Sequence, residues 1–293
     1  MTLFIRTTAI ILIALALSGT VRAQVLWSVQ GPDGQQNWLL GTVHSEDPRL
    51  LDFPEALLET LAAADRLALE LVPDMAMMEV LSQAMHYPEA RLHEVLEPEI
   101  YSQLAAIMEE HYGMGEPALR HLRPWAAAMT IAVPPPQTGM FMDLVLSIRA
   151  RGMGKDVVAL ETVEEQLDFL AGMSKSLQLE LLRQSVIDFP RQGEMFETLV
   201  STYLAGDLEQ LEAVAYEQMS ELKPELLEHF EQVGMIQRNH VMVERALPWL
   251  EQGGLMIAVG ALHLPGEDGL IELLRAGGWR VEPALLAYAD PAS

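Results

Sequence analysis

Short apolar runs of strand length constrain the fold of this chain more than any other feature. They are separated by longer stretches in which apolar residues recur at helical spacing. Strands that alternate with helices in this way predict an α/β fold, with a central mixed β-sheet flanked by helices. The strand-like runs are residues 25–29, 38–43, 66–72, 156–160, 255–259 and 279–282, and a further short run follows at 285–288.

The helical patterns fill the intervals between these runs. They cover residues 54–64, 75–85, 98–111, 117–131, 143–151, 161–171, 175–187, 193–204, 208–219 and 225–250. The block from about 174 to 235 contains no strand-like run, so we predict a helical insertion or subdomain there. The proline-rich segment 133–139 is predicted to be a stiff loop rather than a domain boundary, and 24–293 to form a single domain.

The N-terminus has the pattern of a secretory signal peptide. Arg6 precedes an apolar run at 9–17, and the short residues Val21 and Ala23 suit cleavage after Ala23. The apolar run is shorter than the ~20 residues that span a bilayer, which predicts a periplasmic or secreted protein with no stable membrane span after cleavage. An uncleaved N-terminal anchor is the alternative interpretation.

Charge and cysteine content exclude several functions. The chain has 18 basic and 42 acidic residues, a formal net charge of −24, and such a field repels phosphates, so no nucleic acid is expected as a partner. It has no cysteine, which excludes disulfides, thiol catalysis and thiolate metal ligands. The oligomeric state cannot be predicted from these features.

Two strand-like runs end in the same motif, Gly-x-x-His. Residues 38–40 lead into Gly41 and His44, and residues 255–259 lead into Gly260 and His263. Loops at the carboxyl ends of strands form the ligand-binding crevice of α/β sheets, and glycine allows a sharp turn there. We therefore expect the two histidines to converge on one ion, whereas a single such motif would indicate only a buried or capping histidine.

Two glutamates occupy similar places at strand ends. Glu70 lies within the run 66–72, and Glu161 directly follows the run 156–160. A carboxylate in an apolar run is costly to bury unless it is paired with a cation or a metal. For Glu70 the alternative is an ion pair with Arg66 or another arginine. For Glu161 it is a place in the acidic first turn of a helix, where it would complement the helix dipole.

Two imidazoles and one or two carboxylates suit a divalent transition metal such as manganese, cobalt, zinc or iron. A metal of this kind polarises a carbonyl and lowers the pKa of bound water to ~7, and the remaining carboxylate would serve as general base. Arg238, followed by Asn239, would stabilise a developing oxyanion if its helix faces the crevice. A surface salt bridge is the alternative for Arg238.

The remaining histidines and the methionines are given structural interpretations. Methionines are concentrated at Met75, Met77, Met78 and Met85, a spacing more typical of an adaptable core or groove lining than of a copper site. No serine-hydrolase elbow and no phosphate-binding glycine-rich loop is present. The histidines assigned no functional role are His86, His93, His111, His121, His229 and His240.

The same residues resemble the TraB/GumN family, which is related to the Tiki metalloproteases and to a fold group of erythromycin esterases and haem-binding proteins. The likeness covers nearly all of the mature chain and lies in residues 40–44, 64–70, 160–166, 238–239 and 259–266. It implies an active centre of His44, His263, Arg238 and either Glu70 or Glu161. Tiki-like members are described as manganese- or cobalt-dependent proteases, but a shared fold alone does not transfer chemistry.

The leading hypothesis is an exported, metal-dependent hydrolase that cleaves a peptide or a similar acyl bond. The substrate is expected to be a peptide or a small molecule. A second hypothesis is a non-catalytic periplasmic protein that holds a peptide, a metal or haem in the same crevice. A third is that the helical insertion docks a partner and the crevice no longer functions.

Overall fold

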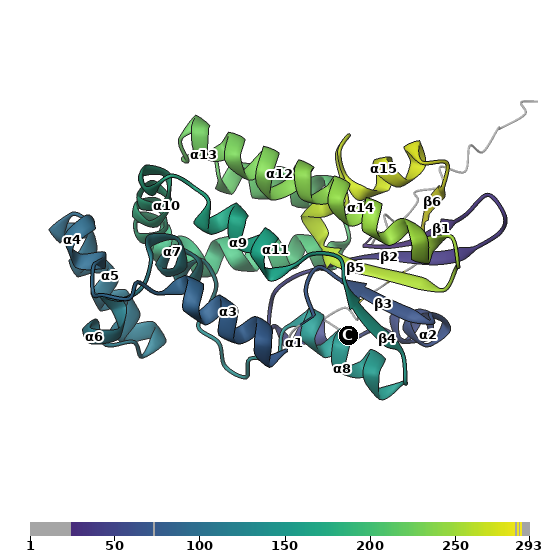
Figure 1. The fold of residues 1–293 in the computed structure, drawn as a ribbon, viewed down its shortest axis with the longest axis horizontal. Helices are drawn as coiled ribbons and strands as arrows, with labels where there is room; N and C mark the ends of the chain where they lie inside the picture. Colours follow the sequence, from purple (N-terminus) through teal and green to yellow (C-terminus); the bar gives the residue numbers. More distant parts are fainter. Residues whose placement is uncertain (1–24, 73, 285, 287, 289–293) are drawn as a thin grey trace, which may run out of the picture.

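A six-stranded mixed sheet organises one end of the molecule (Figure 1). The computed structural model describes residues 25–72, 74–284, 286 and 288. The strand order is β4-β3-β5-β2-β1-β6, with β2, β3, β4 and β5 parallel and β1 antiparallel to both β2 and β6. The strands are β1 (Leu26–Gln30), β2 (Gln36–Thr42), β3 (Arg66–Leu69), β4 (Asp156–Ala159), β5 (Leu255–Gly260) and β6 (Arg280–Pro283).

The predicted α/β class is confirmed, and the strands fall close to the predicted runs. The largest difference is at β3, which ends at Leu69 rather than at residue 72. The short run predicted at 285–288 lies partly outside the described residues, and the predicted leader, 1–23, lies wholly outside them. Within the described ranges, no helix has both the length and the apolar character needed to cross a bilayer.

Helices surround the sheet and form the other end of the molecule (Figure 1). The α-helices are α1 (Pro48–Leu51), α2 (Glu55–Ala63), α3 (Met75–Met85), α4 (Leu92–Val95), α5 (Pro98–Tyr112), α6 (Glu116–Leu119), α7 (Pro124–Ala132), α8 (Met142–Gly152), α9 (Val163–Ala171), α10 (Lys175–Asp188), α11 (Gln192–Ala205), α12 (Leu208–Gln218), α13 (Pro224–His229), α14 (Gln237–Leu250) and α15 (Leu270–Ala276). The 3-10 turns η1 (Phe189–Arg191) and η3 (Ala261–His263) and the π-helix η2 (Phe230–Ile236) complete the set.

Two predicted helices differ from the structure in instructive ways. The pattern at 117–131 is divided into α6 and α7, because Arg123 is held extended by the proline that follows it, and Pro124 opens α7. The pattern at 225–250 is one continuous helical segment, but it changes to π-helical geometry at η2, between α13 and α14. Apolar periodicity alone does not reveal either feature.

The buried side chains form two hydrophobic cores. The sheet core joins the strands to α2, α8, α14 and α15, and the helical core lies among α4 to α7, α10 and α13. The segment 174–235 is free of strands, as expected, but it does not form one separate body. Its α11 and α12 contribute Val200, Tyr203 and Leu211 to the sheet core, whereas its α10 and α13 contribute Leu182 and Leu226 to the helical core.

Candidate active site at the carboxyl ends of the parallel strands

The parallel strands bring the predicted site residues to one edge of the sheet. Thr42 at the end of β2 lies opposite Gly260 in β5, and Leu69 at the end of β3 lies opposite both Ala258 in β5 and Ala159 in β4. The residues that follow these four strand ends therefore lie near one another. They include His44, Glu70, Glu161 and His263, which come from distant parts of the sequence.

The two glycines of the Gly-x-x-His motifs allow close packing and do not make the sharp turns that we expected. Neither has a positive φ, and Gly260 has a φ of −49°. A Cβ added at Gly41 would lie 2.9 Å from the Cα of Ala261, and one added at Gly260 would lie 3.2 Å from Oε1 of Glu70. At Gly41 the close approach of η3 to β2 leaves no room for a Cβ, and at Gly260 the Glu70 side chain leaves little room for one.

Arg238 joins Glu70 and Glu161 in a buried ion cluster. Its Nη2 donates to Oε2 of Glu70 and to Oε2 of Glu161, both at 2.7 Å, and its Nε donates to Oε1 of Glu161 at 2.8 Å. Nη1 donates to the carbonyl oxygen of Gly234 at 3.2 Å, in the π-helix that precedes α14. Arg238 thus makes no surface salt bridge, and it is the arginine partner of Glu70, whereas Arg66 pairs with Asp156.

Glu161 lies outside the helix that follows it. Helix α9 begins at Val163 with Thr162 as its N-cap, and Glu164 and Glu165 supply the acidic first turn. The alternative interpretation of Glu161 as a first-turn acid is therefore wrong. Its side chain is buried against Arg238, and its backbone N–H donates to the carbonyl oxygen of Glu70 at 2.9 Å.

Glu70 is buried but remains ionised. Burial acts to raise the pKa of its carboxyl group, but the imidazole of His263, the guanidinium of Arg238, the imidazole of His44 and the N–H of Gly260 outweigh burial and lower that pKa to about 2. Oε1 accepts the Gly260 N–H at 2.7 Å and lies 3.8 Å from Nε2 of His263. Glu70 is thus a fixed negative charge beside an imidazole.

His263 is held in one orientation by Asn239. The Asn239 side chain donates from Nδ2 to the carbonyl oxygen of Asp268 at 2.8 Å, so its Oδ1 faces Nδ1 of His263, at 2.6 Å. Nδ1 must then carry the proton, which leaves the lone pair on Nε2 directed toward Glu70. Burial lowers the pKa of His263, so the ring is neutral at neutral pH.

His44 lies beside a carboxylate that the sequence analysis did not single out. Its Nε2 is 3.8 Å from Oδ2 of Asp143, on helix α8, and its ring packs on Phe141 with centroids 5.3 Å apart. Asp143 is buried, and its Oδ1 accepts from the hydroxyl of Thr42 at 2.9 Å, but Oδ2 has no hydrogen-bond partner. Burial raises the pKa of Asp143.

A loop fastened by Glu46 brings Asp143 to the site. The carboxylate of Glu46 accepts the backbone N–H groups of Gln137, Thr138 and Gly139 at 2.7 to 3.0 Å, in the proline-rich segment that leads into α8. These bonds lower the pKa of Glu46, the N–H of Thr138 having the largest effect. The loop that follows His44 and the segment that precedes Asp143 are thereby joined.

A cavity of about 360 Å³ opens beside this site. Its polar lining consists of His44, Glu70, Asp143 and Gln166. Gln166, on α9, donates to both Glu70 and Glu161 at 3.1 and 3.2 Å, and it also escaped the sequence analysis. Its apolar lining consists of Leu71, Met77, Met78, Leu81, Phe141, Val163, Leu167 and Leu170. Glu161, Arg238 and His263 do not line the cavity and lie behind Glu70.

The sequence contained a signal for Asp143, whereas Gln166 stood out only as the last residue of the family-like stretch 160–166. Asp143 shares a helical face with Leu146, Ser147 and Ala150, all of which are buried, and an acid on an apolar face indicates a buried carboxylate. Gln166 occupies a polar position on the first turns of α9 that looks like any solvated position. Only the tertiary fold directs it toward Glu70.

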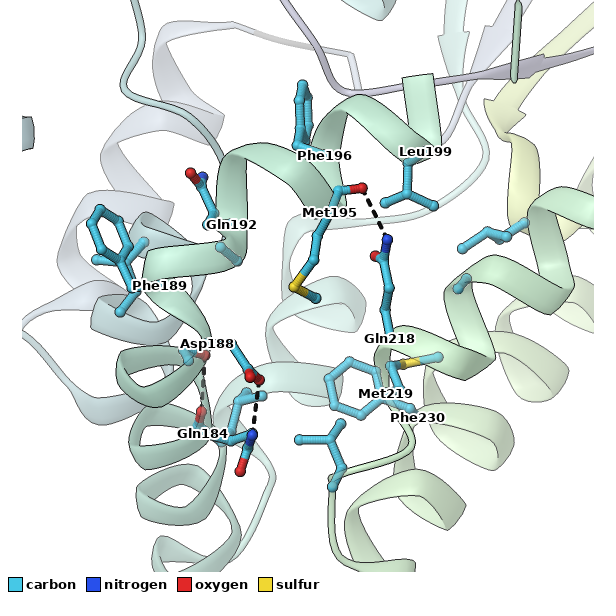
Figure 2. Close-up of a pocket in the computed structure, with 17 residues that line it drawn as sticks. Gln184, Asp188, Phe189, Gln192, Met195, Phe196, Leu199, Gln218, Met219 and Phe230 are labelled. Carbon is cyan, nitrogen blue, oxygen red and sulfur yellow. Dashed lines mark hydrogen bonds between the residues drawn. The ribbon is translucent and has the colours of Figure 1, made fainter. Parts of the chain in front are cut away.

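A second cavity, of about 310 Å³, contains none of these groups (Figure 2). Helices α10, α11 and α12 form most of its wall, with Met195, Met219 and Phe230 among its lining residues, and Gln184 donates to Asp188 at 2.9 Å (Figure 2). Across the described part of the chain, no set of three or more histidine, aspartate or glutamate side chains lies close enough to form a ready metal site.

Comparison with known proteins gives a family and two relatives. The sequence model of the TraB/PrgY/gumN family matches residues 25–283. Two relatives, each called uncharacterized protein YbaP, come from Shigella flexneri and Escherichia coli K12. Each is 27% identical over 253 residues, which cover 83% of this chain and 89% of the relative. No solved structure matches the chain.

Proposed function

We propose a function for this chain from the premise that it belongs to the TraB/PrgY/gumN family. It is an exported hydrolase that cleaves a peptide or a similar acyl bond with a divalent transition metal. One observation carries this proposal: the two Gly-x-x-His histidines, from opposite ends of the described chain, each lie 3.8 Å from a buried carboxylate, Asp143 for His44 and Glu70 for His263, and both carboxylates line one cavity. The leader predicted at residues 1–23 supports export.

The two histidine–carboxylate pairs are not hydrogen-bonded. At 3.8 Å, the pairs His44–Asp143 and His263–Glu70 are too far apart for hydrogen bonds. The His263–Glu70 spacing lies within the range of about 3 to 4.5 Å that two ligands of one ion have when each metal–ligand bond is about 2.1 Å long. Because the described side chains do not form a ready three-ligand site, the proposal requires His44 to move toward that pair when the ion binds. The unpartnered Oδ2 of Asp143 also lacks a compensating group, and a nearby cation would supply one. The donor set of nitrogen and oxygen suits manganese, cobalt or zinc.

In this proposal His44, His263 and Glu70 would hold the ion. A bound ion of this kind polarises a carbonyl and lowers the pKa of water. Asn239 fixes His263 with its Nε2 lone pair toward Glu70, as outer hydrogen-bond partners of metal-binding histidines commonly do. The neutrality of the buried His263 keeps that lone pair available at neutral pH.

Asp143 is the carboxylate best placed to accept a proton. Both oxygens of Glu70 are engaged, Oε1 by Gly260 and Oε2 by Arg238 and Gln166. Both oxygens of Glu161 are engaged as well, and Glu161 does not line the cavity. Asp143 does line it, and its Oδ2 is buried without a hydrogen-bond partner, so it is the one oxygen of the three carboxylates left to accept a proton.

Arg238 and Glu161 act as positioning residues in this arrangement. Nε, Nη1 and Nη2 of Arg238 all donate to groups of the protein, and the guanidinium does not reach the cavity lining. Its charge compensates the paired carboxylates and holds Glu70 in place. In this proposal Arg238 therefore orients Glu70, and it does not stabilise an oxyanion as the sequence analysis expected.

Metal content of the purified mature protein tests the proposal. We expect about one divalent transition ion per chain, with His44→Ala and His263→Ala each losing the ion and any peptidase or esterase activity while the circular dichroism spectrum stays unchanged. His111→Ala, a histidine on α5 outside the cluster, serves as the control and keeps its metal. Full retention of metal in the double variant His44→Ala/His263→Ala would contradict the proposal.

A binding protein without turnover is the second candidate. The observation that favours it is the mutual pairing of Glu70, Glu161 and Arg238, which leaves few free catalytic atoms in the cavity. Tight binding of a metal, a peptide or haem by the wild-type protein, with no product from a broad peptide and ester screen, would select this candidate. Product formation that depends on Asp143 would select the hydrolase.

A further inference from the structure

We propose that the cavity beside His44 and Glu70 is a selective slot for a bulky apolar side chain of a peptide, next to the bond to be cleaved. The catalytic meaning of this inference rests on the proposed function, but the binding does not require turnover.

Two helices form the apolar walls of the slot. On α9 the lining residues are Val163, Leu167 and Leu170, which follow one another at intervals of four and three residues and so share one helical face. On α3 they are Met77, Met78 and Leu81. The two helices pack against each other.

These walls expose apolar surface to the cavity. No residue of α9 or α3 is fully buried, and Met78 is 54% exposed. Exposed apolar surface gathered in a cavity next to polar groups is typical of a ligand site. Because methionine side chains are unbranched and flexible, the α3 wall can adapt to aliphatic and aromatic side chains of different shape.

The polar groups of the cavity are few. They are His44, Glu70, Asp143 and Gln166, against eight apolar lining residues. A charged side chain placed among these apolar walls would lose its hydration without gaining a partner. An uncharged apolar side chain covers the walls without this cost, while its backbone carbonyl can approach His44 and Asp143.

Methionine-methyl NMR tests the slot without any need for metal or turnover. The mature protein is labelled with [methyl-¹³C]methionine and titrated with acetyl-Leu-Leu-amide or acetyl-Ala-Ala-amide. Each titration is done once in EDTA, without metal, and once with added zinc. We expect the leucine peptide to bind at least about tenfold more tightly than the alanine peptide. The methyl signals of Met77 and Met78 should move, whereas that of Met75, 84% exposed on the same helix, should not.

Charge substitutions at matched methionines then locate the binding. Met77→Lys should reduce the affinity for the leucine peptide to that for the alanine peptide, and Leu167→Lys on the opposite wall should do the same. Met75→Lys is the control and should leave the affinity unchanged. Equal affinity for the two peptides, or equal losses in Met75→Lys and Met77→Lys, would overturn the inference.

The two proposals fail in different ways. Preference for the leucine peptide in EDTA, without any binding of metal, would support the slot and contradict the proposed metal-dependent hydrolase. Binding of metal through His44 and His263, without discrimination between the two peptides, would support the metal site and contradict the slot.

Discussion

Asn239 contacts His263 on the side of the ring opposite to Glu70, so a single amide sets both the tautomer and the direction of the Nε2 lone pair. Asn239→Leu should lower the affinity for divalent metal by about 10- to 100-fold, as loss of an outer-shell partner typically does. It should also lower the free energy of unfolding by about 1 to 3 kcal/mol, because the buried Nδ1–H loses its acceptor.

Zinc titration and urea unfolding measure these two effects of Asn239→Leu separately. His240→Ala, at the neighbouring but half-exposed position, is the control and should change neither quantity. An Asn239→Leu protein with wild-type metal affinity would show that the orientation of His263 does not matter for the ion.

Gly41 gives a prediction that depends only on packing. A Cβ at this position would meet the backbone of Ala261 at 2.9 Å, and backbone cannot yield cheaply. Gly41→Ala should therefore lower the free energy of unfolding by about 1 to 3 kcal/mol, measured by urea denaturation. Gly193→Ala, within α11 and with no atom within 4 Å of the new Cβ, should raise it by about 0.5 to 1 kcal/mol. Similar effects at the two positions would contradict this account of Gly41.

Single residues were predictable where a strand delivers them and unpredictable where a helix or loop does. His44, Glu70, Glu161 and His263 follow parallel strands, and parallel strands share an edge. Asp143 reaches the site because Glu46 fastens a loop far from it in sequence.

At the scale of elements, predicted boundaries succeeded where local chemistry sets them. The strands are recognisable because apolar residues fill nearly the whole of β5. Pro124 divides a pattern that periodicity makes continuous, and the chemistry of proline would have revealed this boundary. The π-helix at η2 leaves no mark in the apolar pattern, although it contains Gly234, where an added Cβ would meet the ring of Phe169.

The start of α9 gives a prediction with a definite pH window. Glu165 forms a capping box with Thr162, and hydrogen bonds from Arg245 and then from the Thr162 N–H lower the pKa of Glu165 from 4.5 to about 2. The unfolded chain therefore binds the proton more readily, so the stabilisation is present above about pH 4.5 and is lost as the pH falls toward 2. Because the pair is substantially exposed, its contribution is below about 1 kcal/mol.

Glu165→Gln isolates this ionic contribution, because glutamine keeps the capping geometry but carries no charge. Urea unfolding should show wild type to be more stable than the variant at pH 6, and the difference should shrink at pH 3. A difference independent of pH would show that the charge of Glu165 does not contribute. Glu164→Gln, at the adjacent exposed position, is the control and should show a smaller difference.

At the scale of the whole molecule, the candidate slot lies where the two hydrophobic cores meet. Leu81, Leu167 and Leu170 pack against the helical core, whereas Glu70 follows a strand of the sheet core. Ligand sites commonly lie at such junctions. One core thus supplies the apolar walls of the candidate slot, and the other supplies its polar edge.

Tyr203 joins helix α11 to the edge of the sheet that carries the candidate site. It is fully buried on α11, and its hydroxyl donates to the carbonyl oxygen of Gly41 at 2.8 Å. Tyr203→Phe keeps the packing and removes this donor, so the free energy of unfolding should fall by about 1 to 2 kcal/mol.

For a chain of this size, Tyr203→Phe should lower the melting temperature by a few degrees, measured by calorimetry. Because Gly41 begins the Gly-x-x-His motif that contains His44, the affinity of Tyr203→Phe for metal should fall as well as its melting temperature. A purely global destabilisation would leave the metal affinity of the folded protein unchanged. Tyr216→Phe, at a 47% exposed tyrosine on α12, is the matched control and should alter neither quantity. Equal behaviour of the two variants would show that α11 is joined to the sheet by apolar packing alone.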